Sequence, residues 1–337
     1  MALDGARWTD MAGGWIAASV AIVVWGVTFA STRVLLEEFS ALEINVLRFA
    51  LAWAALAIGG ALRRPRGGHA GRVTLPLQND IPIEKDVLPW WLFPAMGFTG
   101  VFAYQFLENC AIYYTNASNV AILVSFGPIV TAVMARMLTA DRSLSPRLVC
   151  GSLVAVAGVA VVALNGVVNF QLRPLGDAMA LAAMASWGIY SVLIEKANRL
   201  GVEPLAAVRK SFGWAVLMML PLAAWGVTEA GYIALDGSCS VTLGAAANIE
   251  RLSSFRNLGN LAFLGLLASA ACFVLWSRAC RALGVVRTTI GLYLTPVVGV
   301  VFATLFLDER ITWLSVAGGM LIVCGVAVAN TKRRDVG

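Results

Sequence analysis

Two charged side chains inside apolar segments are the residues of this sequence that could do chemistry. Glu108 lies in the segment 104–134, together with Asn109 and Asn116, and Arg48 lies about seven residues inside another apolar segment. At 1.5 Å per residue, Arg48 and Glu108 are each about 10 Å from the nearer end of their helices. Charges at such depth are costly unless they pair or meet water, so they indicate a functional site.

The two charges allow different mechanisms. Arg48 could bind a substrate carboxylate through two parallel hydrogen bonds, or it could be a structural or snorkelling arginine. An unpaired Glu108 could take up and release a proton during a transport cycle. A Glu108 paired with Arg48 would instead be a structural strut, or an outer gate that opens when substrate competes for the arginine. A position facing lipid or a loop is the third alternative.

Aromatic and polar side chains elsewhere in apolar segments are further candidates for a substrate site, with core packing as the alternative explanation for each. Trp25 and Thr28 share one helical face, and Tyr104 shares a face with Glu108. The full set of candidates is Trp25, Thr28, Arg48, Tyr104, Glu108, Asn119, Trp187, Tyr190, Trp276 and Tyr293. No metal or cofactor is expected, since His69 is the sole histidine and the cysteines lack metal-site spacing.

The composition defines the class of protein that must position these residues. Hydrophobic residues make up 59% of the 337 residues and charged residues only 13%, whereas soluble domains have roughly 45–50% apolar and about 25% charged residues. A bilayer core needs roughly 20 apolar residues per helix. We therefore predict an all-α polytopic membrane protein with ten transmembrane helices, at residues 14–35, 41–62, 88–112, 116–139, 145–165, 175–195, 204–228, 257–280, 284–306 and 311–330.

The distribution of Lys and Arg predicts the orientation in the membrane. With ten spans and the N-terminus inside, only six of the 25 basic residues fall on the outer side, and cytoplasmic loops are the ones that retain positive charge. We expect a multi-pass protein of the inner (plasma) membrane with both termini in the cytoplasm. The net charge of +6 suits inner-leaflet lipid, so no nucleic-acid partner is expected.

An internal repeat predicts two halves, at residues 1–167 and 168–337. Trp25 and Gly26 match Trp187 and Gly188, and the later match aligns Pro128 with Pro296 and Asp141-Arg142 with Glu309-Arg310. Five spans per half is an odd number, so the second half must be inverted relative to the first. Inverted repeats around a site near the bilayer midplane are typical of secondary transporters. Both prolines remove a backbone donor in mid-span, where a kink could act as a hinge.

Several ordered blocks resemble the EamA family of the drug/metabolite transporter superfamily. They are the first Trp-Gly pair, the Arg-Phe-Ala triplet at 48–50, the block ENCAIYYTNASNVAILVSFGPI, the block WSRACRALGVVRTTIGLYLTPVVGV and the turn LDERIT. The resemblance implies a bundle of two inverted five-helix repeats, a central cavity between spans 1, 3, 4, 6, 8 and 9, and export or exchange of small metabolites. The segment 63–87 is longer than is usual in the family.

The functional prediction is a secondary active exporter of small metabolites, such as amino acids or related compounds, that works by alternating access with or without proton coupling. An uncoupled facilitator is the alternative within transport. A membrane-embedded enzyme acting on a lipid-linked substrate is the alternative from another class, but it would need acidic or histidine clusters at a membrane face. The expected partners are a small-molecule substrate and membrane lipid, and the chain is expected to be a monomer or homodimer.

Overall fold

The computed structural model describes most of the chain, and the part that it describes contains helices and no strands. The predicted loops at 63–87 and 229–256 lie outside the described residues, except for 251–256. The described residues are 2–39, 41–62, 88–115, 117–138, 145–164, 173–228, 251–306 and 312–331.

The first half of the chain contains two long helices, then two interrupted ones, then a fifth. The third consists of α3, the π-helix η1 and α4 in direct succession, and the fourth consists of α5 and α6. The bounds are α1 Ala2–Leu36, α2 Ala41–Leu62, α3 Leu92–Gly97, η1 Phe98–Ala103, α4 Tyr104–Tyr114, α5 Ala117–Val124, α6 Gly127–Leu138 and α7 Pro146–Leu164.

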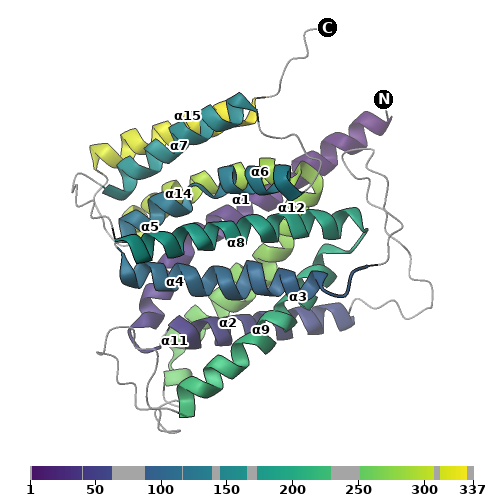
Figure 1. Ribbon diagram of the computed structural model, residues 1–337, viewed down its shortest axis with the longest axis vertical. Helices are drawn as coiled ribbons and strands as arrows, with labels where there is room; N and C mark the ends of the chain where they lie inside the picture. The colour runs from purple at the N-terminus through teal and green to yellow at the C-terminus, as the bar shows by residue number, and fades with distance from the viewer. Residues whose placement is uncertain are drawn as a thin grey trace.

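The second half has the same order of continuous and interrupted helices. A π-helix, η2, again interrupts its third long helix, and a 3-10 turn, η3, interrupts its fourth. The bounds are α8 Pro174–Arg199, α9 Pro204–Thr228, α11 Phe255–Ala262, η2 Phe263–Ala271, α12 Cys272–Leu283, α13 Val285–Ile290, η3 Gly291–Leu294, α14 Thr295–Phe306 and α15 Trp313–Asn330. The start of α1 and the end of α15 lie toward the same end of the bundle (Figure 1).

Eight segments of the described chain are long and apolar enough to cross a membrane. This confirms a polytopic helical membrane protein, but it does not by itself confirm ten spans. The predicted spans 88–112, helical from Leu92 on, and 204–228 are not among the eight. The first contains Glu108 and Asn109 and the second contains Arg209 and Lys210, and such residues lower the mean hydropathy.

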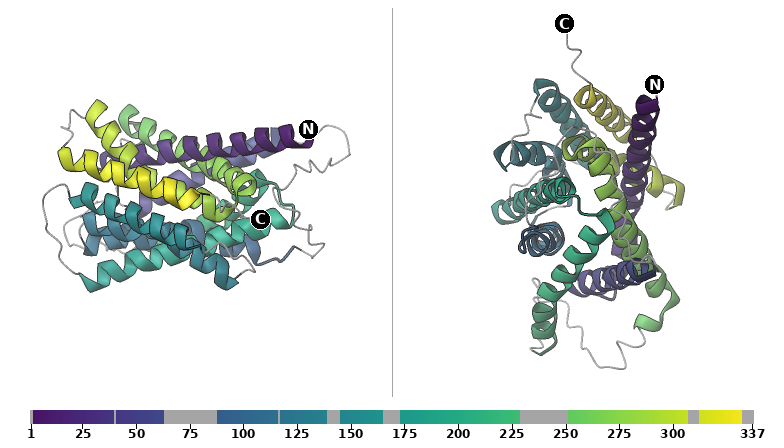
Figure 2. Two further views of the ribbon diagram at one scale, coloured as in Figure 1. Left: turned by 90° about the horizontal axis from the view of Figure 1, so that it is seen from above. Right: turned by 90° about the vertical axis from the view of Figure 1, so that its right-hand side faces the viewer.

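Two helices of the first half, α2 and α7, pack antiparallel against their equivalents in the second half, α9 and α15. Gly151 of α7 lies against Gly325 of α15, and Gly158 lies against Gly318, so the two backbones are in contact along the pair. A Cβ at Gly158 would come within 2.6 Å of the Gly318 carbonyl oxygen. The absence of side chains at these positions permits this close approach, and α7 and α15 lie side by side at one edge of the bundle (Figures 1 and 2).

The remaining contacts between the halves are also reciprocal. Helix α1 packs against α12 and α14, while α8 packs against the equivalent helices α4 and α6. Two glycines repeat this relation in detail, because Gly26 lies against Val298 of α14 and Gly188 lies against Val130 of α6. The cores of the two halves are therefore shared, with the first helix of each half inserted against the later helices of the other.

Both prolines that align across the repeat mark a break in a helix. Pro128 is the second residue of α6, which follows the break after Val124, and Pro296 is the second residue of α14, which follows the 3-10 turn η3. Proline is accommodated in the first turn of a helix because its missing N–H has no intrahelical partner there. The expected kinks thus fall where the helix departs locally from α-helical geometry.

Candidate functional site

A cluster of aromatic rings lies where the first helices of the two halves meet α12. The Trp25 ring of α1 lies 6.2 Å from Trp187 of α8, 5.6 Å from Phe273 and 5.2 Å from Trp276, measured between ring centroids. Phe273 and Trp276 are three residues apart on α12, so they share one helical face. Edge and tilted arrangements at these distances are favourable for aromatic pairs.

The cluster extends in two directions from this centre. On one side Trp187 contacts Tyr104 at 5.1 Å and Tyr190 at 5.4 Å. On the other side Phe273 contacts Phe212 of α9 at 5.0 Å, and Phe212 contacts Phe49 of α2 at 5.2 Å. Five of the predicted site residues are therefore brought together. They are Trp25, Tyr104, Trp187, Tyr190 and Trp276.

The two charged candidates flank this cluster. Arg48 is 8% exposed, its Nε donates to the Ser269 hydroxyl at 2.9 Å, and its guanidinium lies 5.0 Å from the Phe49 ring centroid. Glu108 accepts a hydrogen bond from the Tyr104 hydroxyl at 3.0 Å, as their spacing on one face of α4 allows.

The structure shows Arg48 and Glu108 hydrogen-bonded to other side chains and not to each other. Among the described residues the ion pairs are formed by other side chains. Ser269 and Tyr104 occupy the positions of direct partners instead.

Within the described part of the chain, two indole N–H groups of the cluster have no hydrogen-bond partner. Nε1 of Trp187 and Nε1 of Trp276 are both buried and unpaired, whereas Nε1 of Trp25 donates to the Ala268 carbonyl of the π-helix η2 at 2.9 Å. Buried tryptophans usually find an acceptor for this group.

The π-helices take part in the contacts between the two halves. The Ser186 hydroxyl of α8 donates to the Thr99 carbonyl of η1 at 2.8 Å, as Trp25 of α1 does to Ala268 of η2. Each π-helix thus receives a hydrogen bond from the first helix of the other half. π-Helical turns are frequent at functional sites, and no pattern in the sequence predicted these two.

Three predicted residues are placed differently from the cluster. The Thr28 hydroxyl donates to the Trp25 carbonyl at 2.7 Å, so its donor is used within α1. Tyr293 packs in a separate cluster with residues such as Val156 of α7 and Ile322 of α15. The side chain of Asn119 lies outside the described part of the structure.

Four further side chains complete the site and were not in the predicted set, namely Phe49, Phe212, Ser269 and Phe273. Phe49 belongs to the Arg-Phe-Ala triplet and Ser269 lies seven residues before Trp276, so both carried a weak signal. Nothing in the sequence marked Phe212. Within the described residues there is no group of three His, Cys, Asp or Glu side chains that could hold a metal ion.

A polytopic helical bundle with charged and aromatic residues gathered between its two halves is the architecture of a membrane transporter. A model of the EamA-like transporter family matches residues 12–164 and again residues 174–331. The chain belongs to this family, and the resemblance seen in the sequence blocks is confirmed.

Proteins of known name are similar over nearly the whole chain. A probable terminal-alkyne amino-acid exporter of Streptantibioticus cattleyicolor is 28% identical over 94% of this chain and 92% of its own length. A probable amino-acid metabolite efflux pump of Escherichia coli K12 is 25% identical over 93% of both. A crystal structure covering 95% of this chain, at 18% identity, superposes with a TM-score of 0.69 and therefore has the same fold.

Proposed function

We propose that this protein is a secondary active exporter of amino acids or related small metabolites, working by alternating access. The observation that carries the proposal is the aromatic cluster with Arg48 on one flank, Glu108 on another and two unpaired indole donors inside it. An amino acid carries one carboxylate and one ammonium group. Arg48 and the indole N–H groups suit the carboxylate, and Glu108 suits the ammonium.

The aromatic rings suit the rest of such a solute. Trp25, Trp187 and Trp276 surround one another at centroid distances between 5.2 and 6.3 Å, and they can hold an apolar side chain or a cation. The names of the two relatives, an amino-acid exporter and an amino-acid metabolite efflux pump, support the same substrate class. Neither name extends to this chain on its own.

Alternating access requires two halves that can rearrange around the site, and we propose ten spans in two inverted repeats, at 1–167 and 168–337. The antiparallel packing of α7 on α15 supports the inversion. So does α2 on α9, where Gly60 lies against Arg209 and Trp53 lies against Gly213. Equivalent helices that run in opposite directions are expected from an inverted repeat.

The proposed orientation places both termini in the cytoplasm of a cell whose plasma membrane holds the protein. The start of α1 and the end of α15 lie toward the same end of the bundle, as an even number of crossings requires. The excess of Lys and Arg in the loops at that end supports its assignment to the cytoplasm.

Proton coupling distinguishes an active exporter from a facilitator, and we assign it to Glu108. Its partner Tyr104 is neutral, and Arg48 forms its hydrogen bond with Ser269, so Glu108 is not fixed as the anion of an ion pair. A carboxyl group in this setting can exchange a proton and an ammonium group in turn. A facilitator is the second candidate, because the Tyr104 hydrogen bond would also suit a fixed strut.

The test is solute-dependent proton flux in liposomes that enclose a pH-sensitive dye. Wild-type protein, Glu108→Gln and the control Glu195→Gln are reconstituted and supplied with pooled amino acids. Glu195 pairs with Arg199 near the end of α8, so its variant makes the same chemical change away from the cluster. We expect flux in the wild type and the control, and loss of flux in Glu108→Gln with solute exchange retained.

Other outcomes have definite meanings. Solute movement without proton flux in both the wild type and Glu108→Gln would remove the proton role of Glu108 and leave a facilitator. A correctly folded wild type that moves none of the pooled amino acids would contradict the substrate class.

A further inference from the structure

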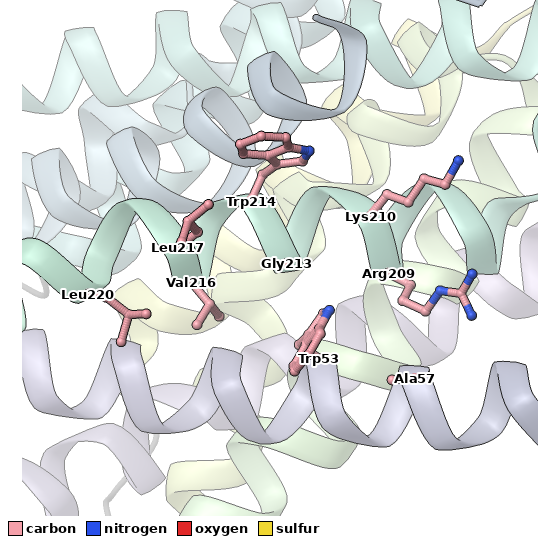
Figure 3. Close-up of a pocket in the computed structure, with 9 residues that line it drawn as sticks. All are labelled: Trp53, Ala57, Arg209, Lys210, Gly213, Trp214, Val216, Leu217 and Leu220. Carbon is pink, nitrogen blue, oxygen red and sulfur yellow. The ribbon is translucent and has the colours of Figure 1, made fainter. Parts of the chain in front are cut away.

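An open groove lies between α2 and α9, on the outside of the bundle and separate from the aromatic cluster. Its volume is about 650 Å³, and its lining includes Trp53 of α2 and Trp214, Leu217 and Leu220 of α9. Trp53 and Trp214 are 43% and 42% exposed, and Leu217 is 54% exposed. Figure 3 shows Trp53 between the two helices, with Leu220 toward one end.

The other end of the groove is basic. Arg209 and Lys210 both line it (Figure 3), and none of the described residues that line it is acidic. The Lys210 ammonium lies 4.6 Å from the Phe93 ring centroid, and the Arg209 guanidinium lies against Gly60, where a Cβ would overlap it. The ion pairs among the described residues involve neither of them.

The length of the groove matches one leaflet of a bilayer. From Arg209 to Leu220 the helix rises about 16 Å, and half of a hydrocarbon core of about 30 Å is about 15 Å. A ligand with an anionic head and an apolar chain of that length would place its head at the two cations and its chain along the exposed tryptophans.

We propose that the groove between α2 and α9 binds an anionic phospholipid, with its phosphate at Arg209 and Lys210 and an acyl chain along Trp53, Trp214 and Leu217. Arginine can bind two phosphate oxygens at once and lysine adds a compact charge. Basic pockets between membrane helices are suited to anionic headgroups. The proposal concerns a lipid site only and does not depend on the transported substrate.

A second copy of the chain is a poorer occupant. In a membrane dimer with a twofold axis along the bilayer normal, both copies would present the same surface. Arg209 and Lys210 of each copy would then lie on the same side of the membrane and near their counterparts. Like charges brought together in this way oppose association.

Native mass spectrometry of the purified protein with equimolar phosphatidylglycerol and phosphatidylcholine tests the proposal. We expect the wild type to retain phosphatidylglycerol preferentially. Each basic residue near an anionic lipid surface strengthens binding about fivefold, so Arg209→Gln/Lys210→Gln should weaken phosphatidylglycerol retention about 30-fold. The matched control is Arg278→Gln/Arg287→Gln, which removes two charges outside the groove and should behave as the wild type.

Two further measurements do not require removal of the charges. Ala57→Phe places a ring in the groove and should reduce retention while Arg209 and Lys210 remain. In wild-type vesicles, brominated phosphatidylglycerol should quench tryptophan fluorescence more than brominated phosphatidylcholine, and the difference should shrink in Trp53→Phe/Trp214→Phe.

The proposal is overturned by any of four results. They are equal retention of the two lipids by the wild type, unchanged retention in the Arg209/Lys210 variant, equal quenching by the two brominated lipids, and displacement of the lipid by soluble glycerol phosphate, which lacks the apolar chain. A dimer that forms without retained lipid and dissociates in Ala57→Phe would also overturn it.

Discussion

Replacing Ser269 by alanine should destabilise the protein by removing the partner of a buried charge. The Ser269 hydroxyl is fully buried and accepts from Arg48 Nε at 2.9 Å, and Arg48 itself is 8% exposed. A hydrogen bond to a charged group contributes about 1.5–3 kcal/mol, and the buried donor left behind has no substitute. We therefore expect Ser269→Ala to lower the free energy of unfolding by about 2 kcal/mol.

Ser211→Ala is the matched control for this change. Ser211 is equally buried, but its hydroxyl donates to the Val208 carbonyl of its own helix at 2.9 Å. Its removal leaves no buried donor unpaired, so the expected loss is below about 0.5 kcal/mol. The two serines thus differ in whether their partner is a charge or a backbone carbonyl.

The assay is unfolding of the purified variants in detergent, by denaturant titration and by thermal melting followed by fluorescence. For a chain of 337 residues, a loss of about 2 kcal/mol corresponds to a Tm lower by about 3 °C. The double variant Arg48→Met/Ser269→Ala isolates the interaction, since without the charge the serine should contribute little. The reasoning is refuted if Ser269→Ala costs no more than Ser211→Ala, or costs the same with and without Arg48.

Two more predictions concern the scaffold. Gly158→Leu should lower the free energy of unfolding by at least about 3 kcal/mol and lower the yield of folded protein on size-exclusion chromatography, because its side chain would meet the α15 backbone. The control Gly319→Leu should be tolerated, since nothing lies within 4 Å of a Cβ there. Equal behaviour of the two variants would contradict the packing of α7 on α15. Thr312→Ala should lower the free energy of unfolding by about 1 kcal/mol in the same assay, because the Thr312 hydroxyl caps α15 by accepting from the Ser315 N–H at 3.1 Å. The control Thr331→Ala, at the far end of α15, should lower it less. A larger loss in Thr331→Ala would contradict the cap.

The sequence was informative where a residue type is costly in its surroundings. A charge within an apolar segment needs a partner or water, so Arg48 and Glu108 could be singled out without a structure. Paired Trp-Gly motifs and aligned prolines identified the repeat, because a duplicated helix retains its breaks and close contacts. The family could be named from the same blocks and is confirmed by the match over both halves.

The local environment of those residues could not be predicted in the same way. That Arg48 bonds to Ser269, 221 positions away, depends on how two distant helices are rotated against each other. Tyr293 lies in a 3-10 turn, which has about 3.0 residues per turn in place of 3.6. The face it occupies therefore differs from the one that helical spacing would assign, and it packs with α7 and α15 instead of the tryptophans.

The reciprocal hydrogen bonds at the two π-helices bear on how the chain reaches its folded state. The Thr99 carbonyl accepts from Ser186 and the Ala268 carbonyl accepts from Trp25. Each hydrogen bond therefore joins one half of the chain to the other. A fragment that ended after α7, or one that began at α8, would keep the acceptor of one such bond and the donor of the other. Neither fragment could form these two hydrogen bonds on its own, so this part of the core is complete only when both halves are together.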